Sequence, residues 1–338
     1  MISKFLFSAI VLILIFPFSV LSQKPAERNS IRIMFYNVEN LFDTIDDPET
    51  DDNEFTPQGD RHWTPKKFEK KIENTAKVIV AAGGWESPAI IGLCEIENQF
   101  VLEKLCNHPL LKKSDYHIIH KESPDHRGID VALLYRKDLF IPETYSAIPV
   151  LNEKGDTLPT REILHVTGAF QDGRQFHFFV SHWPSRYGGL METENGRKLA
   201  AKCLKQAVDN VQTERPDAGI ICMGDFNDQP YDESIRKVLG ASPVQEDTGI
   251  SKLVNISSGV GNSGIAGTLK HQQEWAVFDQ FIISRNLLSV TKTSVFTAGF
   301  LLEPDAKFTG NKPFRTYAGF RYTGGFSDHL PVLLDLQK

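Results

Sequence analysis

Polar side chains that can bind a metal ion or transfer a proton follow several apolar, β-rich runs of this sequence. Asn37 comes directly after the run Ile31–Tyr36, and Glu95 comes directly after Ile90–Cys94. Open sheets place ligands at strand ends, where side chains from different strands converge on one cleft. The pattern therefore predicts a single polar site built from distant parts of the chain. Its other members are His182, which follows Phe178–Ser181; Asp225 and Asn227, which follow Ile220–Gly224; and Asp328 and His329, which precede the last apolar run.

Each of these residues also has an ordinary structural explanation. Asn37 could start a turn, Glu95 could form a salt bridge, and His182 could be a hydrogen-bonded core histidine. Asp328 could begin a turn, and Asp225 stands in a string that is common in loops. Five such coincidences in one ordered series favour a shared functional site.

Packed sheets with helices outside are predicted to hold these residues. Thr64 followed by Pro65 is typical of the start of a helix, and Gly83-Gly84 is typical of its end. A second long helix is predicted from about Glu192 to Val211. Many short strands with only two long helices favour this layered arrangement. The β-rich runs predict strands at Ile31–Tyr36, Ala89–Cys94, Tyr116–His120, Ile129–Tyr135, Phe176–Ser181, Ile220–Gly224, Val277–Ser284 and Leu330–Leu334.

Seven sequence motifs carry a family resemblance. They are YNVENLF (36–42), LCEIEN (93–98), GIDVALLYR (128–136), SHWPSR (181–186), GDFND (224–228), VFDQFIIS (277–284) and SDHLPV (327–332). In type and order they resemble the motifs of the endonuclease/exonuclease/phosphatase superfamily. The resemblance covers the chain from Ile31 to the C-terminus. The resemblance implies an α/β (α+β) four-layered sandwich, in which two mixed β-sheets pack face to face with helices outside.

The resemblance also implies a catalytic Mg²⁺ or Mn²⁺ ion. Glu95 would be its principal ligand, Asn37 would bind or orient nearby, and Asp328 would lie beside the metal. Oxygen ligands suit Mg²⁺, which takes few protein carboxylates and keeps several waters. Hydrolysis of a phosphate ester needs the charge on the phosphoryl oxygens to be neutralised, together with a positioned water and help for the leaving group.

The remaining motif residues are assigned catalytic roles by the same resemblance. Asp225 would align or deprotonate the attacking water, Asn227 would hold the phosphate or the nucleophile, and His329 would transfer a proton. Each histidine should have a carboxylate that fixes its tautomer. The resemblance places Asp279 at the position to pair with His329 and Asp130 at the position to pair with His182, although either could be an ordinary hydrogen-bonding Asp in a sheet. Arg186 and Arg197 are candidates for contact with the substrate phosphate.

Three functional interpretations stay open. The sequence around His182, SHWPSR, resembles the corresponding motif of secreted deoxyribonucleases, sphingomyelinases and inositol-phosphate phosphatases more than that of the abasic-site repair branch. The first interpretation is a metal-dependent phosphodiesterase such as a nuclease, although the net charge of −6 argues against tight non-specific binding of nucleic acid. The second is a phosphomonoesterase or a lipid-headgroup hydrolase of the inositol-phosphate or sphingomyelin type. The third, a non-catalytic binding protein, is weakened because every expected catalytic position is filled.

The N-terminus is typical of an exported protein. Lys4 precedes an apolar run from Phe5 to Phe18, and Val20-Leu21-Ser22 resembles a cleavage site. The expected organisation is a signal peptide at 1–22, a short linker at 23–29 and a single catalytic domain at 30–338. A periplasmic or secreted protein without a membrane span after cleavage is predicted, and a monomer is favoured.

The mature chain is therefore predicted to begin near Gln23. Cleavage after Ser22 would remove the apolar run and release the domain from the membrane. N-terminal sequencing of protein recovered from periplasm or medium checks this. Intact Met1 on most of the cellular pool would contradict it.

Overall fold

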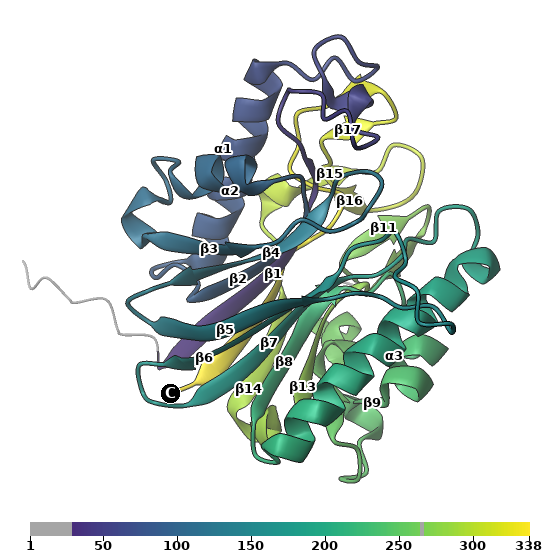
Figure 1. Cartoon of the computed structure of the whole chain (residues 1–338). Helices are drawn as coiled ribbons and strands as arrows, with labels where there is room; N and C mark the ends of the chain where they lie inside the picture. The colour runs from purple at the N-terminus through teal and green to yellow at the C-terminus, as the bar shows by residue number, and fades with distance from the viewer. Residues whose placement is uncertain (1–28, 264–266) are drawn as a thin grey trace, which may run out of the picture.

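Two large β-sheets lie face to face at the centre of the computed structural model, which describes residues 29–263 and 267–338 (Figure 1). The predicted signal peptide, and the predicted linker up to residue 28, lie outside the described residues. The first sheet has the strand order β14-β19-β1-β2-β4-β3, and the second has the order β5-β6-β7-β8-β13-β10-β9. Both are mixed, since β1 pairs parallel to β2 and β7 pairs parallel to β8 while most other pairs are antiparallel.

Eight strands of the two sheets match the predicted β-rich runs, with shifts at their ends, whereas β5, β6, β9, β10 and β14 were not predicted. The first sheet contains β1 (Ser30–Leu41), β2 (Ile90–Ile96), β3 (Tyr116–His120), β4 (Asp130–Arg136), β14 (Thr291–Val295) and β19 (Val332–Gln337). The second contains β5 (Phe140–Ile148), β6 (Ile163–Phe170), β7 (Gln175–His182), β8 (Gly219–Asp225), β9 (Ala241–Pro243), β10 (Leu253–Asn255) and β13 (Asp279–Ser284).

Alternating side chains of each strand fill two separate apolar layers. In β1, Ile33 and Phe35 pack between the two sheets with Phe178 and Phe281 of the second sheet. Met34 belongs instead to the layer beneath the helices. Successive side chains of a strand point to opposite faces, so a strand buried on both faces reads as a continuous apolar run.

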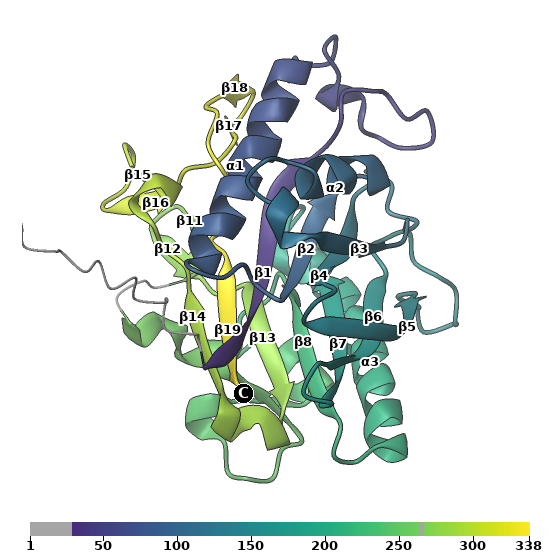
Figure 2. The same ribbon diagram turned by 90° about the vertical axis from the view of Figure 1, so that its left-hand side faces the viewer.

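Helices cover the outer face of each sheet (Figures 1 and 2). α1 (Pro65–Gly83) and α2 (Gln99–Cys106) pack on the first sheet, and α3 (Leu190–Glu214) packs on the second. The predicted four-layered sandwich is thereby confirmed. The eight-residue α2 was missed by the sequence analysis because it is too short for a clear apolar period; Asn98 caps it by accepting a hydrogen bond from the Val101 amide.

Short hairpins and helical turns complete the ends of the sheets. The hairpins are β11 (Leu269–His271) with β12 (Glu274–Ala276), β15 (Leu302–Pro304) with β16 (Asn311–Pro313), and β17 (Tyr317–Ala318) with β18 (Arg321–Tyr322). Short helical turns lie at Asn53–Phe55, Lys112–Ser114, Ser234–Leu239, Val244–Glu246, Ile256–Ser263, Arg285–Val290 and Gly299–Leu301. No helix in the described part of the chain has the length and apolar content needed to cross a bilayer.

Shortening a side chain in the apolar layer between the sheets should strongly destabilise the fold. Phe281 is fully buried there, so Phe281→Ala is expected to lower the free energy of unfolding by about 3–5 kcal/mol through lost burial and a residual cavity. Ile141→Ala is the control, since Ile141 is 57% exposed, and should change it by roughly 0.5 kcal/mol or less. Urea unfolding measures both, and a similar effect of the two substitutions would contradict this packing.

Candidate active site

Irregular pairing between β1 and β2 positions the first two site residues. The register of the pair shifts between Asn37 and Leu41, and β2 also shifts against β4 between Cys94 and Ile96. Glu95 is the extra residue of this second irregularity and has a left-handed backbone, with φ of 60°. Cys94 and Ile96 remain buried in different apolar layers. The bulge therefore removes Glu95 from the regular alternation of the strand.

Asn37 connects the two sheets at this point. Its Nδ2 donates to Glu95 Oε1 at 3.2 Å and to Asp225 Oδ2, at the end of β8, at 3.0 Å. The second carboxylate oxygen of Glu95 accepts from the Asn40 amide at 2.8 Å. The sequence analysis placed Asn37 directly after a strand. Asn37 instead lies inside β1, because that strand extends to Leu41.

Three adjacent strands of the second sheet bring the catalytic candidates side by side. In the pairing of β7 with β8, His182 lies opposite Asp225, and in the pairing of β8 with β13, Asp225 lies opposite Asp279. Asp279 Oδ2 is 2.7 Å from His329 Nδ1, so the predicted contact between this histidine and this carboxylate is confirmed. His329 Nε2 is 3.8 Å from Asp225 Oδ2, and His182 Nε2 is 3.7 Å from the same oxygen.

The two histidines differ in their electrostatic surroundings. Burial lowers the pKa of His182 well below its ordinary value, and the nearby Arg161 charge lowers it further. Burial also acts to lower the pKa of His329, but the charges of Asp279 and Asp225 outweigh it and hold that pKa well above the ordinary value. Near neutral pH, His182 is therefore neutral and His329 is protonated.

Burial also changes the acidity of Asp225. It raises the pKa of this carboxyl to about 7; the charge of His329 opposes that rise and the charge of Asp279 adds to it. A carboxylate whose pKa lies near neutrality is suited to accept and return a proton. Asn227 follows with a left-handed φ of 49°, its amide donates to Asp225 Oδ1 at 2.9 Å, and its Nδ2 donates to the Trp183 carbonyl.

The predicted pairing of Asp130 with His182 is wrong. Asp130 Oδ2 is 3.2 Å from His120 Nε2, and its other oxygen accepts from the Ser123 amide. Asp130 lies on β4 beside β3, which carries His120, whereas His182 belongs to the other sheet. His182 Nδ1 is buried and has no hydrogen-bond partner among the described residues.

The two candidate phosphate-binding arginines both support the segment that follows β8. Arg197 is fully buried on α3, with Nε 2.8 Å from Asp228 Oδ1, so its predicted contact with substrate is wrong. Arg186 donates from Nε to the Asn227 carbonyl at 2.6 Å and from Nη2 to Asp228 at 2.8 Å. The side chain of Arg186 is 27% exposed, so it alone of the two remains open to solvent.

A second polar network beside Asp328 was not anticipated. Arg315 lies 3.0 Å from Asp328 Oδ2 and 3.0 Å from Glu39 Oε1, and the other Glu39 oxygen accepts from the Thr316 amide. Burial raises the pKa of Glu39 to about 7. Lys71 of α1 donates to the Thr316 hydroxyl, and burial lowers its pKa to about 8. Glu39 stands inside the first motif and could have been found there, but the sequence gives no such signal for Arg315 or Lys71.

Two groups of three side chains in the described residues have possible ligand atoms within 4.8 Å of one another. They are Asp225, Asp279 and His329, and His120, Glu122 and Asp130. The first group differs from the predicted ligands Asn37, Glu95 and Asp328. Asp279 is fully buried and already bonded to His329, which leaves no access for the waters that Mg²⁺ retains.

Glu95 fits such an ion better. Its side chain is 15% exposed, and it shares the Asn37 Nδ2 donor with Asp225, so two carboxylates lie close together with no thiolate beside them. Asp328 is more accessible, with 27% of its side chain exposed, but it is paired with Arg315. A buried set of oxygen donors with excess negative charge suits a hard divalent cation.

The chain belongs to the endonuclease/exonuclease/phosphatase family, whose model matches residues 32–338. It is a hydrolase of that family, acting on phosphate esters. No curated protein matches the sequence.

Solved structures share the fold at low identity. A family member from Bacteroides thetaiotaomicron has a TM-score of 0.59 and 17% identity, over 91% of this chain and 97% of that one. Truncated TDP2 from Caenorhabditis elegans has a TM-score of 0.57 and 15% identity, over 91% and 98%. Mannosyl-6-phosphatase from Bacteroides thetaiotaomicron VPI-5482 has a TM-score of 0.55 and 15% identity, over 91% and 99%.

His329 and Asp279 are expected to act as a coupled pair. Loss of general acid–base help should lower the kcat of His329→Ala by roughly 10²–10⁴-fold, and Asp279→Asn should lose less because the imidazole remains. The double variant should be little worse than His329→Ala, since coupled residues are not additive.

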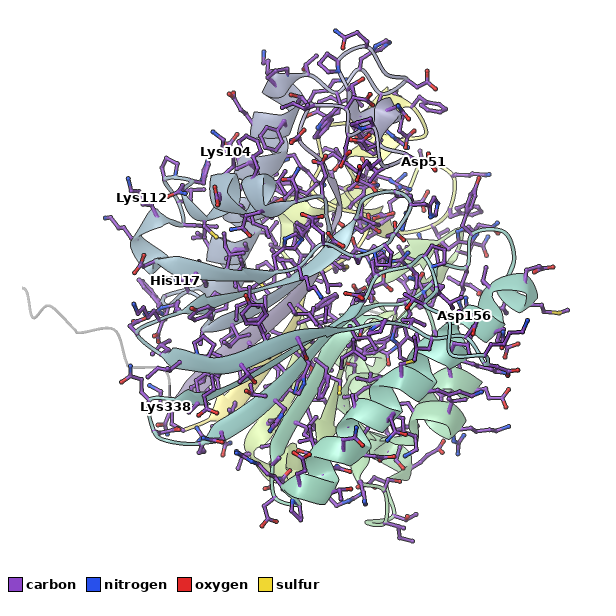
Figure 3. The ribbon with its side chains drawn as sticks, in the orientation of Figure 1. Asp51, Lys104, Lys112, His117, Asp156 and Lys338 are labelled. Atoms are coloured by element: carbon purple, nitrogen blue, oxygen red, sulfur yellow. The ribbon has the colours of Figure 1, made fainter. Side chains whose placement is uncertain are left out.

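Steady-state kinetics of the two single variants and the double variant test this coupling. His117→Ala is a matched control, because His117 Nε2 also lies 3.8 Å from a carboxylate, that of Asp115, but on β3 at the margin of the molecule (Figure 3). Losses that multiply fully would show that His329 and Asp279 act independently.

Proposed function

We propose that the protein is an exported phosphodiesterase that uses Mg²⁺ or Mn²⁺, with nucleic acid as a candidate substrate. The observation that carries this proposal is the convergence of Glu95, Asn37 and Asp225 beside the His329–Asp279 pair. These residues come from both sheets and supply metal-ligating oxygens, a proton acceptor and a cationic imidazole within one cluster. The typical signal-peptide pattern of the N-terminus supports export.

The proposed roles follow from the contacts. When bound, the divalent ion neutralises charge on the phosphoryl oxygens. Glu95 holds it, and Asn37 fixes the orientation of Glu95 through its hydrogen bond to Oε1. Asp225 orients the attacking water and accepts its proton, for which a pKa of about 7 is suitable.

The histidines and Asn227 complete the site. Protonated His329, held by Asp279 at Nδ1, stabilises the negative charge that develops on the phosphoryl group. Neutral His182 presents Nε2 toward Glu95 and Asp225, at 3.9 Å and 3.7 Å, and donates a hydrogen bond to a phosphoryl oxygen. Asn227 positions the phosphate from the end of β8.

A phosphomonoesterase is the second candidate. One of the structures with the same fold is a mannosyl-6-phosphatase, and a shared fold does not select the substrate. A panel of DNA, RNA, phosphoinositides, sphingomyelin and simple phosphate monoesters distinguishes the two candidates. Turnover of monoesters alone would replace the phosphodiesterase proposal with the second candidate.

Activity is expected to depend on a hard divalent ion held by Glu95. EDTA should abolish turnover, and Mg²⁺ or Mn²⁺ should restore it. Glu95→Gln removes the ligand charge and should raise the Mg²⁺ concentration needed for half-maximal rate, while Glu103→Gln, on the exposed surface of α2, should not. Full turnover by metal-free protein, or an unchanged Mg²⁺ requirement in Glu95→Gln, would contradict the assignment.

A further inference from the structure

A cavity of about 220 Å³ adjoins the catalytic cluster. Its lining residues include Glu39, Asn40, Arg61 and Arg315. The Asn40 amide donates to Glu95, and Arg315 contacts Asp328, so two wall residues of the cavity also contact site residues. The loop before α1, which contains Asp51, lies beside the segment around β17 (Figures 1 and 3), and Arg61 Nη1 joins the two by donating to the Gly319 carbonyl.

The guanidinium group of Arg61 is held in a fixed orientation. Its Nε lies 3.1 Å from Glu54 Oε1, and its Cζ lies 4.8 Å from the Phe55 ring centre and 5.1 Å from that of Tyr317. Within the described residues, Nη2 has no hydrogen-bond acceptor. Arg61 thus presents a preorganised donor to the cavity, since the rings and Glu54 restrict its side chain.

Arg315, the second arginine that lines the cavity, is also held by acidic partners. Nε donates to Glu39 Oε1, and Nη2 lies 3.0 Å from both Glu39 and Asp328, while Nη1 has no acceptor in the described part of the chain. Both oxygens of Glu39 are engaged, one by Arg315 and one by the Thr316 amide. Three contacts therefore occupy Glu39, whereas Arg61 and Arg315 each keep N–H groups without an acceptor in the described residues.

We propose that this cavity binds a second oxyanion, a phosphate group of the substrate next to the phosphate that is hydrolysed. The inference rests on the proposed phosphoesterase function and narrows its substrate class. Two arginines with free, oriented N–H groups match the acceptor oxygens of a phosphate. The second phosphate can come from the next linkage of a nucleic-acid strand or from a small ring that carries two phosphates.

Matched substrate pairs test the inference and separate these two sources. One pair is a dinucleotide with and without a 5′-phosphate; the other is an inositol bisphosphate and the corresponding monophosphate. The ratio of kcat/KM for two phosphates over one should be roughly 10-fold or more in at least one pair, as charge-assisted hydrogen bonds allow. The pair that shows the preference identifies the source.

Variants connect that preference to the cavity. Arg61→Gln should reduce the ratio to near one, and Arg61→Lys should give an intermediate ratio because charge remains but the planar fork is lost. Arg174→Gln is the matched control, since Arg174 also pairs with a carboxylate, Asp172, and faces a phenylalanine ring, but lies on the β6–β7 hairpin. Its rates and ratio should equal those of the wild type.

Each outcome separates this inference from the proposed function. The inference is overturned if the single-phosphate substrates are hydrolysed and the ratio of kcat/KM for two phosphates over one is near one in both pairs. It is also overturned if both Arg61 variants keep the wild-type ratio. Either result leaves the proposed function intact. No hydrolysis of any substrate overturns the proposed function, and calorimetric titration with inorganic pyrophosphate then decides the inference. If wild type and Arg61→Lys bind pyrophosphate equally, the inference is overturned. If the variant binds pyrophosphate at least several-fold more weakly, the inference is supported. Thermal unfolding identifies a misfolded Arg61→Gln, in which case Arg61→Lys provides the comparison.

Discussion

The hydrogen bonds of Asn37 are the connection on which the site depends. One amide group donates to Glu95 of the first sheet and to Asp225 of the second, so it sets the spacing between the two carboxylates of the site. An apolar layer between the sheets places these groups at one end of the sandwich. Carboxylates buried there need partners, because an isolated buried charge is strongly unfavourable.

Burial gives similar side chains different chemical properties. His182 and His329 both lie near Asp225, yet one is neutral and the other is protonated, because only His329 has a carboxylate bonded to its ring. Burial raises the pKa of Asp225 itself to about 7. Environments that move neighbouring groups apart in pKa are the usual basis for assigning an acid and a base.

The network of Glu39, Arg315 and Lys71 extends the site beyond the motif residues. It connects β1 and α1 to the segment that precedes Asp328, and two of its members, Glu39 and Arg315, line the cavity beside the site. Substrate selection on this fold depends on such surrounding segments, since the central residues perform the same hydrolysis on different esters. The proposed second-phosphate site assigns this role to Arg61 and Arg315.

The sequence by itself was sufficient for the sandwich and for Asn37, Glu95, Asp225 and the His329–Asp279 contact. Motif order and strand ends are local properties, and apolar runs buried on both faces are visible in the residues themselves. The sequence did not reveal the short α2, the strands β5, β6, β9, β10 and β14, or the bulges that place Asn37 and Glu95.

Only the tertiary structure decided which polar groups meet. Asp130 bonds to His120 and not to His182 because β3 is its neighbour, and Arg197 is buried against Asp228 because α3 covers the second sheet. The protonation states of the two histidines and the network around Arg315 were settled in the same way. Partners and pKa values depend on sheet neighbours and on burial, which join residues that are distant in the chain, and a residue's type and position do not contain that information.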